Sequence, residues 1–285
     1  REQLGLNQPV WVQYVRYLVG LLHGDLGTSI RTQRPVAEDL ATYFPATLEL
    51  ALAAMLLAVL VGVPLGVISA TRQNTWIDHL GRVVAIGGVS MPIFWFGLMA
   101  LLVFYRWLGW LPGSERLDTF LNPPVRITGL YLIDSLLTGN LPVFWNALWH
   151  LILPASCLAY VQVAAISRLV RASMLEVLSQ DYIRTVRAAG LPEWLIVYAH
   201  ALPNALIPVV TGVGLSLGEL LGGAVLTETI FSWPGMGKYV VDSVTFLDFP
   251  AIMGFTIVVA VGYVLINLMV DLSYYLFDPR VREVG

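Results

Sequence analysis

The sequence RASMLEVLSQDYIRTVRAAGLPEWLIVYAHALPNALIPVV, residues 171–210, is a polar interruption between two long apolar segments. In its first half apolar residues recur at intervals of four from Met174 to Val186, so they share one face of a helix. Gly190 can adopt the left-handed conformation that ends many helices. The pattern predicts an amphipathic helix from Arg171 that ends near Gly190, followed by a second helical stretch from Glu193 to Ala201.

The composition places this helical hairpin in a membrane protein. The 285 residues are 57% hydrophobic and 12% charged, and the mean hydropathy is +0.74. Soluble domains carry about a quarter charged residues, so the chain is predicted to be a polytopic membrane protein. The net charge of −3 and the dispersed arginines give no case for nucleic acid. The single cysteine, Cys157, can form no intrachain disulfide.

Five apolar segments are long enough to cross a bilayer, which requires about 20 residues. They are Thr47–Ala70, Val83–Tyr105, Leu148–Val170, Pro203–Thr227 and Ala251–Phe277. Two of these segments contain glycines spaced four apart, Gly62 with Gly66 and Gly218 with Gly222. This spacing favours close packing of membrane helices. The predicted fold class is therefore all-α.

The N-terminal residues 1–46 contain no segment of spanning length, and the sequence begins at Arg1 without a signal-peptide pattern. We expect a sixth, N-terminal transmembrane helix to precede the five visible ones and to deliver residues 1–46 to the external side. The predicted organisation is an external segment 1–46, a transmembrane domain 47–277 with a hairpin at 171–202, and a tail at 278–285.

Basic residues indicate the orientation in the membrane. The loop at 71–82, the hairpin region at 168–202 and the tail at 278–285 together contain eight arginines over short stretches. The positive-inside rule places these segments and the C-terminus in the cytoplasm. The loop Arg106–Ala147 then lies outside. It is rich in proline and glycine, with one short helix expected at Leu130–Leu137.

The spacing inside the hairpin also resembles a known signature. In ABC importer permeases the signature is a Glu-Ala-Ala sequence followed by three residues and a glycine. Nine further residues then separate this glycine from an Ile-x-Leu-Pro sequence. Here Leu202 and Pro203 stand twelve and thirteen residues after Gly190, His200 occupies the isoleucine position, and Arg184-Thr-Val186 replaces Glu-Ala-Ala. These departures resemble the peptide branch of the family, in which Asp-Tyr-Ile-Arg-Thr precedes the glycine.

Further runs extend this resemblance over nearly the whole chain. They are Ser90–Trp95, Gly129–Ser135, His150–Pro154, Phe231–Gly237, Asn267–Tyr274 and Asp278–Arg280. The chain is identified as a member of the peptide/nickel permease family, similar to the first permease subunit of bacterial dipeptide importers.

The resemblance implies the architecture and partners of a type I ABC importer permease in the bacterial inner membrane. It implies a second homologous permease subunit, two cytoplasmic ATPase subunits that bind ATP and Mg, an external substrate-binding protein, and no cofactor on this chain. It also implies a coupling helix that contacts the ATPases. The residues assigned to that contact are Met174, Leu175, Leu178, Asp181, Tyr182, Arg184, Thr185, Arg187, Ala188, Ala189 and Gly190.

The sequence indicates no catalytic or metal site. Gly237-Lys238 resembles the end of a phosphate-binding loop, but Ser232 and Tyr239 stand where that loop needs a glycine and Ser or Thr. The four histidines form no i, i+4 pair, and no nucleophile motif is present. We therefore expect a transport subunit without its own ATPase site rather than an enzyme.

Candidate residues for the translocation pathway or an external gate are Met91, Pro92, Glu219, Glu228 and Trp233. Glu219 lies in the middle of a predicted span, where a carboxylate is costly and by default marks function. Protonation or a hydrogen bond to a neighbouring helix would equally explain it. Glu228 either meets the amino group of a substrate or makes a structural contact to the external loop.

Two alternative functions remain open. A member of the same family could carry another substrate, such as a nickel chelate, glutathione or haem. A stand-alone ion-coupled secondary transporter could use Glu219 as its proton carrier, although the internal repeats of such proteins are not evident here. An intramembrane enzyme is disfavoured by the missing nucleophile and metal patterns.

Overall fold

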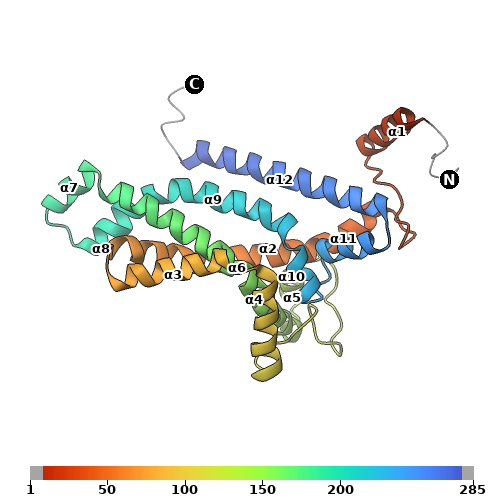
Figure 1. Cartoon of the computed structure of the whole chain (residues 1–285), viewed down its shortest axis with the longest axis horizontal. Coiled ribbons are helices and arrows are strands. Elements are labelled where there is room, and N and C mark those ends of the chain that lie inside the picture. Colours follow the sequence, from red (N-terminus) through yellow and green to blue (C-terminus); the bar gives the residue numbers. More distant parts are fainter. Residues whose placement is uncertain (1–8, 278–285) are drawn as a thin grey trace.

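The computed structural model describes residues 9–277, apart from the side chains of Val89 and of residues 273–277. Four helical segments in this range are long and apolar enough to cross a membrane. They are α2 (Val36–Thr71), α6 (Leu141–Leu178), the run of α8 (Glu193–Leu195), η2 (Ile196–Ala201) and α9 (Leu202–Gly223), and α12 (Phe249–Phe277). These segments lie side by side as an elongated bundle (Figure 1). They correspond to four of the five predicted spans.

The remaining predicted span, Val83–Tyr105, is not one straight helix. It is divided into α3 (Trp76–Ser90), α4 (Ile93–Ala100) and the π-helix η1 (Leu101–Trp107), with a bend of 101° between the two parts. Pro92 disfavours the helical conformation in Met91, whose backbone is extended with ψ 128°. The α4 helix consequently projects away from the bundle (Figure 1).

The shorter helices lie near the ends of the long ones. They are α1 (Val10–Leu22), α5 (Tyr131–Leu137), α7 (Asp181–Ala188), α10 (Val225–Ile230) and α11 (Met236–Thr245). The α5 helix confirms the short helix predicted at Leu130–Leu137. The predicted boundary at residue 46 is not a helix boundary, because α2 begins at Val36 and continues through Pro45 and Pro64.

Close contact between α2 and α6 forms the centre of the bundle. An added Cβ at Gly66 would lie 2.6 Å from Cβ of Val170, and one at Gly62 would lie 3.1 Å from Cβ of Ile166. Buried alanines such as Ala54 and Ala58 continue this contact along α2. The glycine spacing therefore serves helix packing, as predicted from the sequence.

The second glycine pair has the same role between α9 and α12. An added Cβ at Gly218 would lie 2.7 Å from the ring of Tyr263, and one at Gly222 would lie 3.1 Å from Val259. Glycine at both positions lets large side chains of α12 approach the backbone of α9. Both glycine pairs thus fix helix separations in the bundle.

The predicted continuous helix over residues 171–190 is wrong. The α6 helix carries the first part as far as Leu178, and α7 begins separately at Asp181. At the break, the hydroxyl of Ser179 donates to the carbonyl of Glu176 at 2.7 Å, and Gln180 is extended with ψ 150°. Such local side-chain bonds compete with helix continuation. The predicted left-handed glycine is confirmed, because Gly190 has φ +82°.

We expect Gly66→Ala to destabilise the bundle by about 1–3 kcal/mol, because the added methyl group has no room between α2 and α6. The measurement is the thermal unfolding midpoint of the purified protein in detergent. Gly262→Ala in α12 is the matched control, since its added Cβ would meet Leu221 at an ordinary 3.5 Å. An equal midpoint for both variants would contradict the packing role of Gly66.

Candidate functional site

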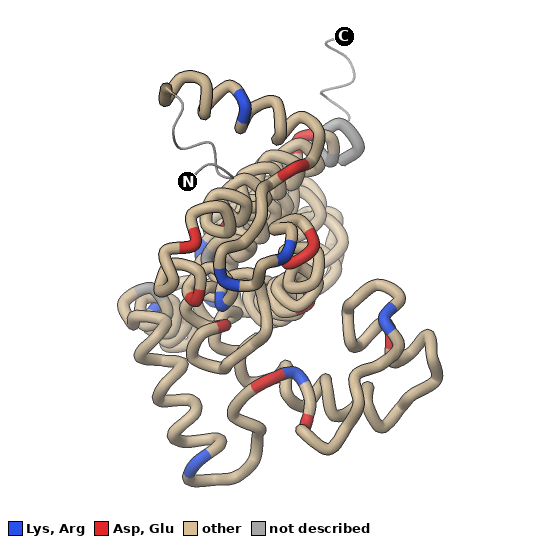
Figure 2. Tube along the Cα trace, turned by 90° about the vertical axis from the view of Figure 1, so that its right-hand side faces the viewer, with Lys and Arg blue, Asp and Glu red and all other residues tan. Residues whose placement is uncertain are grey.

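Polar side chains gather at the two ends of the bundle. At one end lie α7 and α8; at the other lie α5, α10, α11 and the loops between them (Figure 1). Viewed from the second end, acidic and basic residues stand close together around the loops (Figure 2). Within the part of the chain that the structure describes, both ends of the bundle thus carry charged groups on short helices and loops.

The α7 helix is anchored to the bundle by its apolar residues, among which Val186 is partly buried against the core. Ile183 is fully buried and belongs to the same core cluster as Ile196 of η2 and Met174 of α6. The opposite face of α7 is open, with the side chain of Asp181 93% exposed and that of Arg184 72% exposed. The α7 helix therefore exposes a polar surface on one face, while its apolar face holds it against the core of the bundle.

Most residues predicted to contact the ATPases lie on this open surface. Those exposed are Asp181, Tyr182, Arg184, Thr185, Arg187, Ala188, Ala189 and Gly190, and those partly buried are Leu175 and Leu178. Met174 is an exception, because it is fully buried in the core. Its predicted place on a contact surface is wrong, since the end of α6 turns that side chain toward the bundle.

Two polar contacts define the shape of the hairpin. Arg187 donates two hydrogen bonds to the carboxylate of Glu193, at 2.6 and 3.2 Å, and so closes the turn around Gly190. On the other side, Asn204 of α9 donates to the hydroxyl of Tyr182 at 3.0 Å. The α7 helix is thus connected both to α8 and to the start of α9.

A surface pocket of about 630 Å³ lies between this hairpin and the end of α2. Its lining includes Arg72, Leu178 and Arg187. Trp194 of α8 and Tyr198 of η2 are 65% and 57% exposed. Neither aromatic was predicted from the sequence to belong to the contact surface, although aromatic residues in a polar hairpin are a recognisable signal for a protein interface.

A buried ionic cluster at the same end was also missed. Asp78 of α3 is fully buried and accepts two hydrogen bonds from Arg171 of α6, at 2.8 and 2.9 Å, and one from Arg82 at 2.7 Å. Ser69 of α2 donates to the same carboxylate. The cluster joins three helices, and nothing in its sequence spacing brings Asp78 and Arg171 together.

At the opposite end, Glu228 of α10 is fully buried. Its carboxylate accepts hydrogen bonds from the hydroxyl of Thr47 in α2 at 2.7 Å and from the backbone N–H of Lys238 at 3.0 Å. Two roles were predicted for Glu228, a contact with substrate and a structural contact to the external loop, and the structure supports the second. Burial raises the pKa of Glu228 to about 7, although these hydrogen bonds lower it.

Trp233 is also part of this attachment and is 1% exposed. Its indole N–H donates to the backbone carbonyl of Ala46 at 2.8 Å. Neither Glu228 nor Trp233 presents a free side chain to solvent, so both hold the segment between α10 and α11 against α2. A direct gating contact with substrate does not fit their positions in this structure.

The long loop before α5 is fixed by two further carboxylates. Arg116 forms a buried ion pair with Glu49 of α2, and its guanidinium lies 3.4 Å from the ring centroid of Tyr131. Burial alone would raise the pKa of Asp134, but hydrogen bonds from the side chain of Thr128 and from backbone N–H groups hold it below its usual value. No role for these residues was predicted from the sequence.

The other predicted pathway residues lie apart from both clusters. Met91 and Pro92 form the break between α3 and α4, where Met91 is 38% exposed. Glu219 is exposed on the surface of α9. Within residues 9–277, no group of three or more His, Cys, Asp or Glu side chains could hold a metal ion.

The raised pKa of Glu228 predicts a pH-dependent stability. The unfolded chain ionises this carboxyl near the ordinary glutamate pKa of 4.5, whereas the folded protein keeps the proton until about pH 7. The folded state binds more protons in this window, so the free energy of unfolding falls by about 3 kcal/mol as the pH rises from 4.5 to 7. Glu228→Gln should remove this contribution.

The measurement is the thermal unfolding midpoint of the wild-type and Glu228→Gln proteins between pH 4.5 and 8. The variant should gain stability relative to the wild type as the pH rises through this window. Glu38→Gln is the control, because Glu38 is 60% exposed. Parallel curves for the wild type and Glu228→Gln would show that the buried carboxyl does not titrate in this range.

Comparison with known proteins finds similarity to transport permeases. Residues 62–283 match the family described as binding-protein-dependent transport system inner membrane component. The chain is 60% identical, over its full length and 84% of the relative, to the probable D,D-dipeptide transport system permease protein DdpB of Escherichia coli strain K12.

Two further relatives show the range of similarity. Identity is 50% to the dipeptide transport system permease protein DppB of Alkalihalophilus pseudofirmus, over 99% of this chain and 84% of the relative. It is 39% to the glutathione transport system permease protein GsiC of Salmonella paratyphi A, over 99% and 83%. Among solved structures, an amino acid ABC transporter has a similar fold, with a TM-score of 0.53 and 16% identity over 85% of this chain and 94% of that chain.

Proposed function

Because this chain belongs to the family of binding-protein-dependent transport system inner membrane components, a family of multi-pass inner-membrane permeases, we propose that it imports dipeptides. The observation that carries the substrate class is the 60% identity, across the whole chain, to a probable D,D-dipeptide permease. Identity to the glutathione permease is 39%. The difference favours a dipeptide over the glutathione alternative.

The proposed importer contains a second homologous permease subunit, two ATPase subunits that bind ATP and Mg, and an external substrate-binding protein. The surface of the single chain supports such an assembly. Only 11% of the most apolar window of α12 is buried within the chain, so most of this helix is free to contact lipid or another subunit. Glu219, exposed on α9, would also be open to a neighbouring subunit.

In this proposal, α7 and its hairpin are the element that the ATPases move. The polar face of α7 is exposed, and Ile183 joins the opposite face to the core. The bond between Asn204 and Tyr182 connects α7 to α9. Closure of the ATPases would shift the hairpin and the long helices together, which is a rigid-body form of alternating access. The hairpin and the C-terminus then face the cytoplasm.

The importer assembly has a direct test. A tagged chain purified from native membranes in mild detergent should bring down a second permease and two ATPases. After reconstitution with its binding protein, the complex should take up a radiolabelled dipeptide only when ATP is present inside the vesicles. Uptake driven by an ion gradient, by the chain alone, would instead support a secondary transporter with Glu219 as proton carrier.

Charge exchange across the hairpin tests the role of its shape. Arg187→Glu places two carboxylates where Arg187 and Glu193 now form an ion pair, so it should weaken the turn and reduce ATP-driven uptake several-fold. The double variant Arg187→Glu with Glu193→Arg restores the pair with its charges reversed. It should recover most of the uptake if the pair acts by shaping the hairpin.

The measurement is ATP-driven uptake together with co-purification of the ATPases for each variant. Arg106→Gln, an exposed change at the end of η1, is the control for loss of a surface arginine. Full uptake by the single Arg187→Glu variant would overturn the coupling role. Failure of the double variant, with the ATPases lost, would assign Arg187 to a direct charge contact instead.

A further inference from the structure

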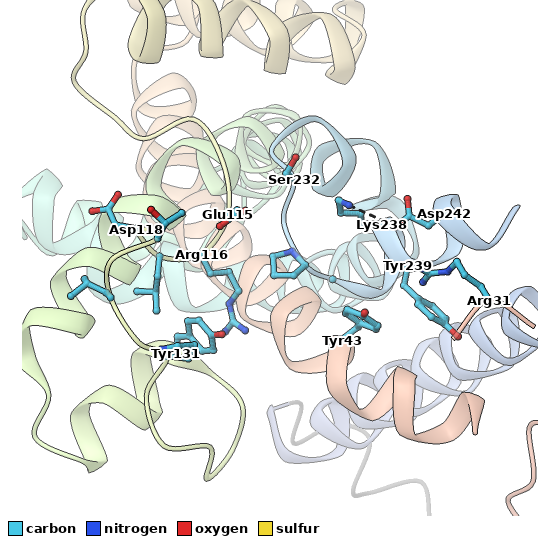
Figure 3. Close-up of a pocket in the computed structure, with 16 residues that line it drawn as sticks. Arg31, Tyr43, Glu115, Arg116, Asp118, Tyr131, Ser232, Lys238, Tyr239 and Asp242 are labelled. Carbon is cyan, nitrogen blue, oxygen red and sulfur yellow. Dashed lines mark ion pairs between the residues drawn. The ribbon is translucent and has the colours of Figure 1, made fainter. Parts of the chain in front are cut away.

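The end of the bundle away from α7 contains a pocket of about 540 Å³. It lies between the start of α2, the loop before α5 and the beginning of α11 (Figure 3). Pockets of about 300–1,000 Å³ are typical of small-molecule sites. Its volume is therefore suited to a small ligand rather than to the broad contact of a protein partner.

One side of this pocket carries positive charge. The guanidinium of Arg31 lies over the ring of Tyr239, 5.4 Å from its centroid, and makes no ion pair with any described residue. Its Nε is buried and has no hydrogen-bond acceptor among the described residues. Lys238 lies on the same side of the pocket (Figure 3) and forms an ion pair of 3.7 Å with Asp242. Among the residues that line this side, Asp242 balances Lys238, and the side chain of Arg31 has no ion pair within residues 9–277. Outside the lining, the backbone N–H of Arg31 donates to the buried carboxylate of Asp248 at 3.1 Å.

The other side carries negative charge. Glu115 is exposed and forms no ion pair with a described residue. Asp118 accepts a hydrogen bond from the side chain of Asn146 at 2.6 Å and lies 3.5 Å from Nε2 of His150. Figure 3 shows Glu115 and Asp118 on one side of the pocket, with Arg31 and Lys238 on the other.

The groups between these two sides contribute little net charge. Arg116 lines the pocket but is neutralised by its buried ion pair with Glu49. Tyr43 and Tyr131 supply aromatic surface, and Pro234 and Gly235 supply backbone and apolar surface. The pocket thus has an anionic end, an apolar middle and a cationic end.

We propose that this pocket is a binding site for a small zwitterion, with its ammonium group at Glu115 and Asp118 and its carboxylate at Arg31. The ligand follows from the proposed function, on which this proposal rests: an importer of dipeptides handles free dipeptides, which carry an ammonium group at one end and a carboxylate at the other. Side chains of the peptide would lie along the tyrosines and Pro234. The site would accept the peptide at the outer end of the permease and discriminate by its termini.

The test is direct binding of alanyl-alanine to the purified importer complex in nanodiscs, without binding protein, by saturation-transfer NMR titration. Arg31→Gln and Glu115→Gln should each weaken binding about tenfold, since each removes one charged hydrogen-bonding partner. Arg31→Lys keeps the charge and should retain most of the affinity. Arg106→Gln and Glu38→Gln, at exposed side chains that do not line the pocket, should bind as the wild type.

Modified peptides assign each terminus to its side of the pocket. N-acetyl-alanyl-alanine should bind the wild type weakly and should be insensitive to Glu115→Gln. Alanyl-alanine amide should be insensitive to Arg31→Gln. Equal affinity of all variants for alanyl-alanine, or no dependence on the peptide termini, would overturn the proposal.

Two other measurements separate the possible causes of failure. If Arg31→Gln weakens docking of the substrate-binding protein and leaves peptide binding unchanged, the pocket is a protein contact and the zwitterion site is wrong. ATP-driven dipeptide uptake by a wild-type complex that does not bind free alanyl-alanine would also overturn the site while the proposed function stands. Loss of ATP-driven uptake in the wild type would instead contradict the function.

Discussion

The fold depends on the close approach of α2 and α6. Helices in a bilayer gain little from the hydrophobic effect when they associate, so they need dense packing to hold together. Gly62 and Gly66 bring the backbone of α2 onto Ile166 and Val170 of α6, and buried alanines extend this contact. The remaining long helices pack around this pair.

The position of α2 also explains how the two polar ends are organised. At the hairpin end, Ser69 of α2 donates to the buried Asp78. At the other end, Thr47 and Glu49 of α2 hold Glu228 and Arg116. A buried charge is stable only when it is paired or hydrogen-bonded, and α2 supplies a partner at both ends. One continuous helix therefore connects the hairpin region with the segments around the outer pocket.

The broken span and the hairpin show two ways in which helices end in this protein. At Met91–Pro92 the following proline ends α3, and the chain leaves the bundle at a bend of 101°. At Ser179–Gln180 a local side-chain bond ends α6 without a proline, and α7 then turns its apolar Ile183 back to the core. The break at Met91–Pro92 leaves α4 with a large surface outside the bundle. The break at Ser179–Gln180 produces a polar helix, α7, that stays attached to the bundle.

Sequence alone determined the helical class, four of the spans, the packing role of the glycine pairs and the left-handed turn at Gly190, because periodicity, length and glycine spacing are local properties. It did not determine that residues 171–190 form two helices, that Met174 is buried, or that Glu228 faces Thr47. Nor did it indicate that Asp78 meets Arg171, 93 residues away in sequence. Only the tertiary structure decided these pairings and the charged pocket, since each depends on how separate helices are placed side by side.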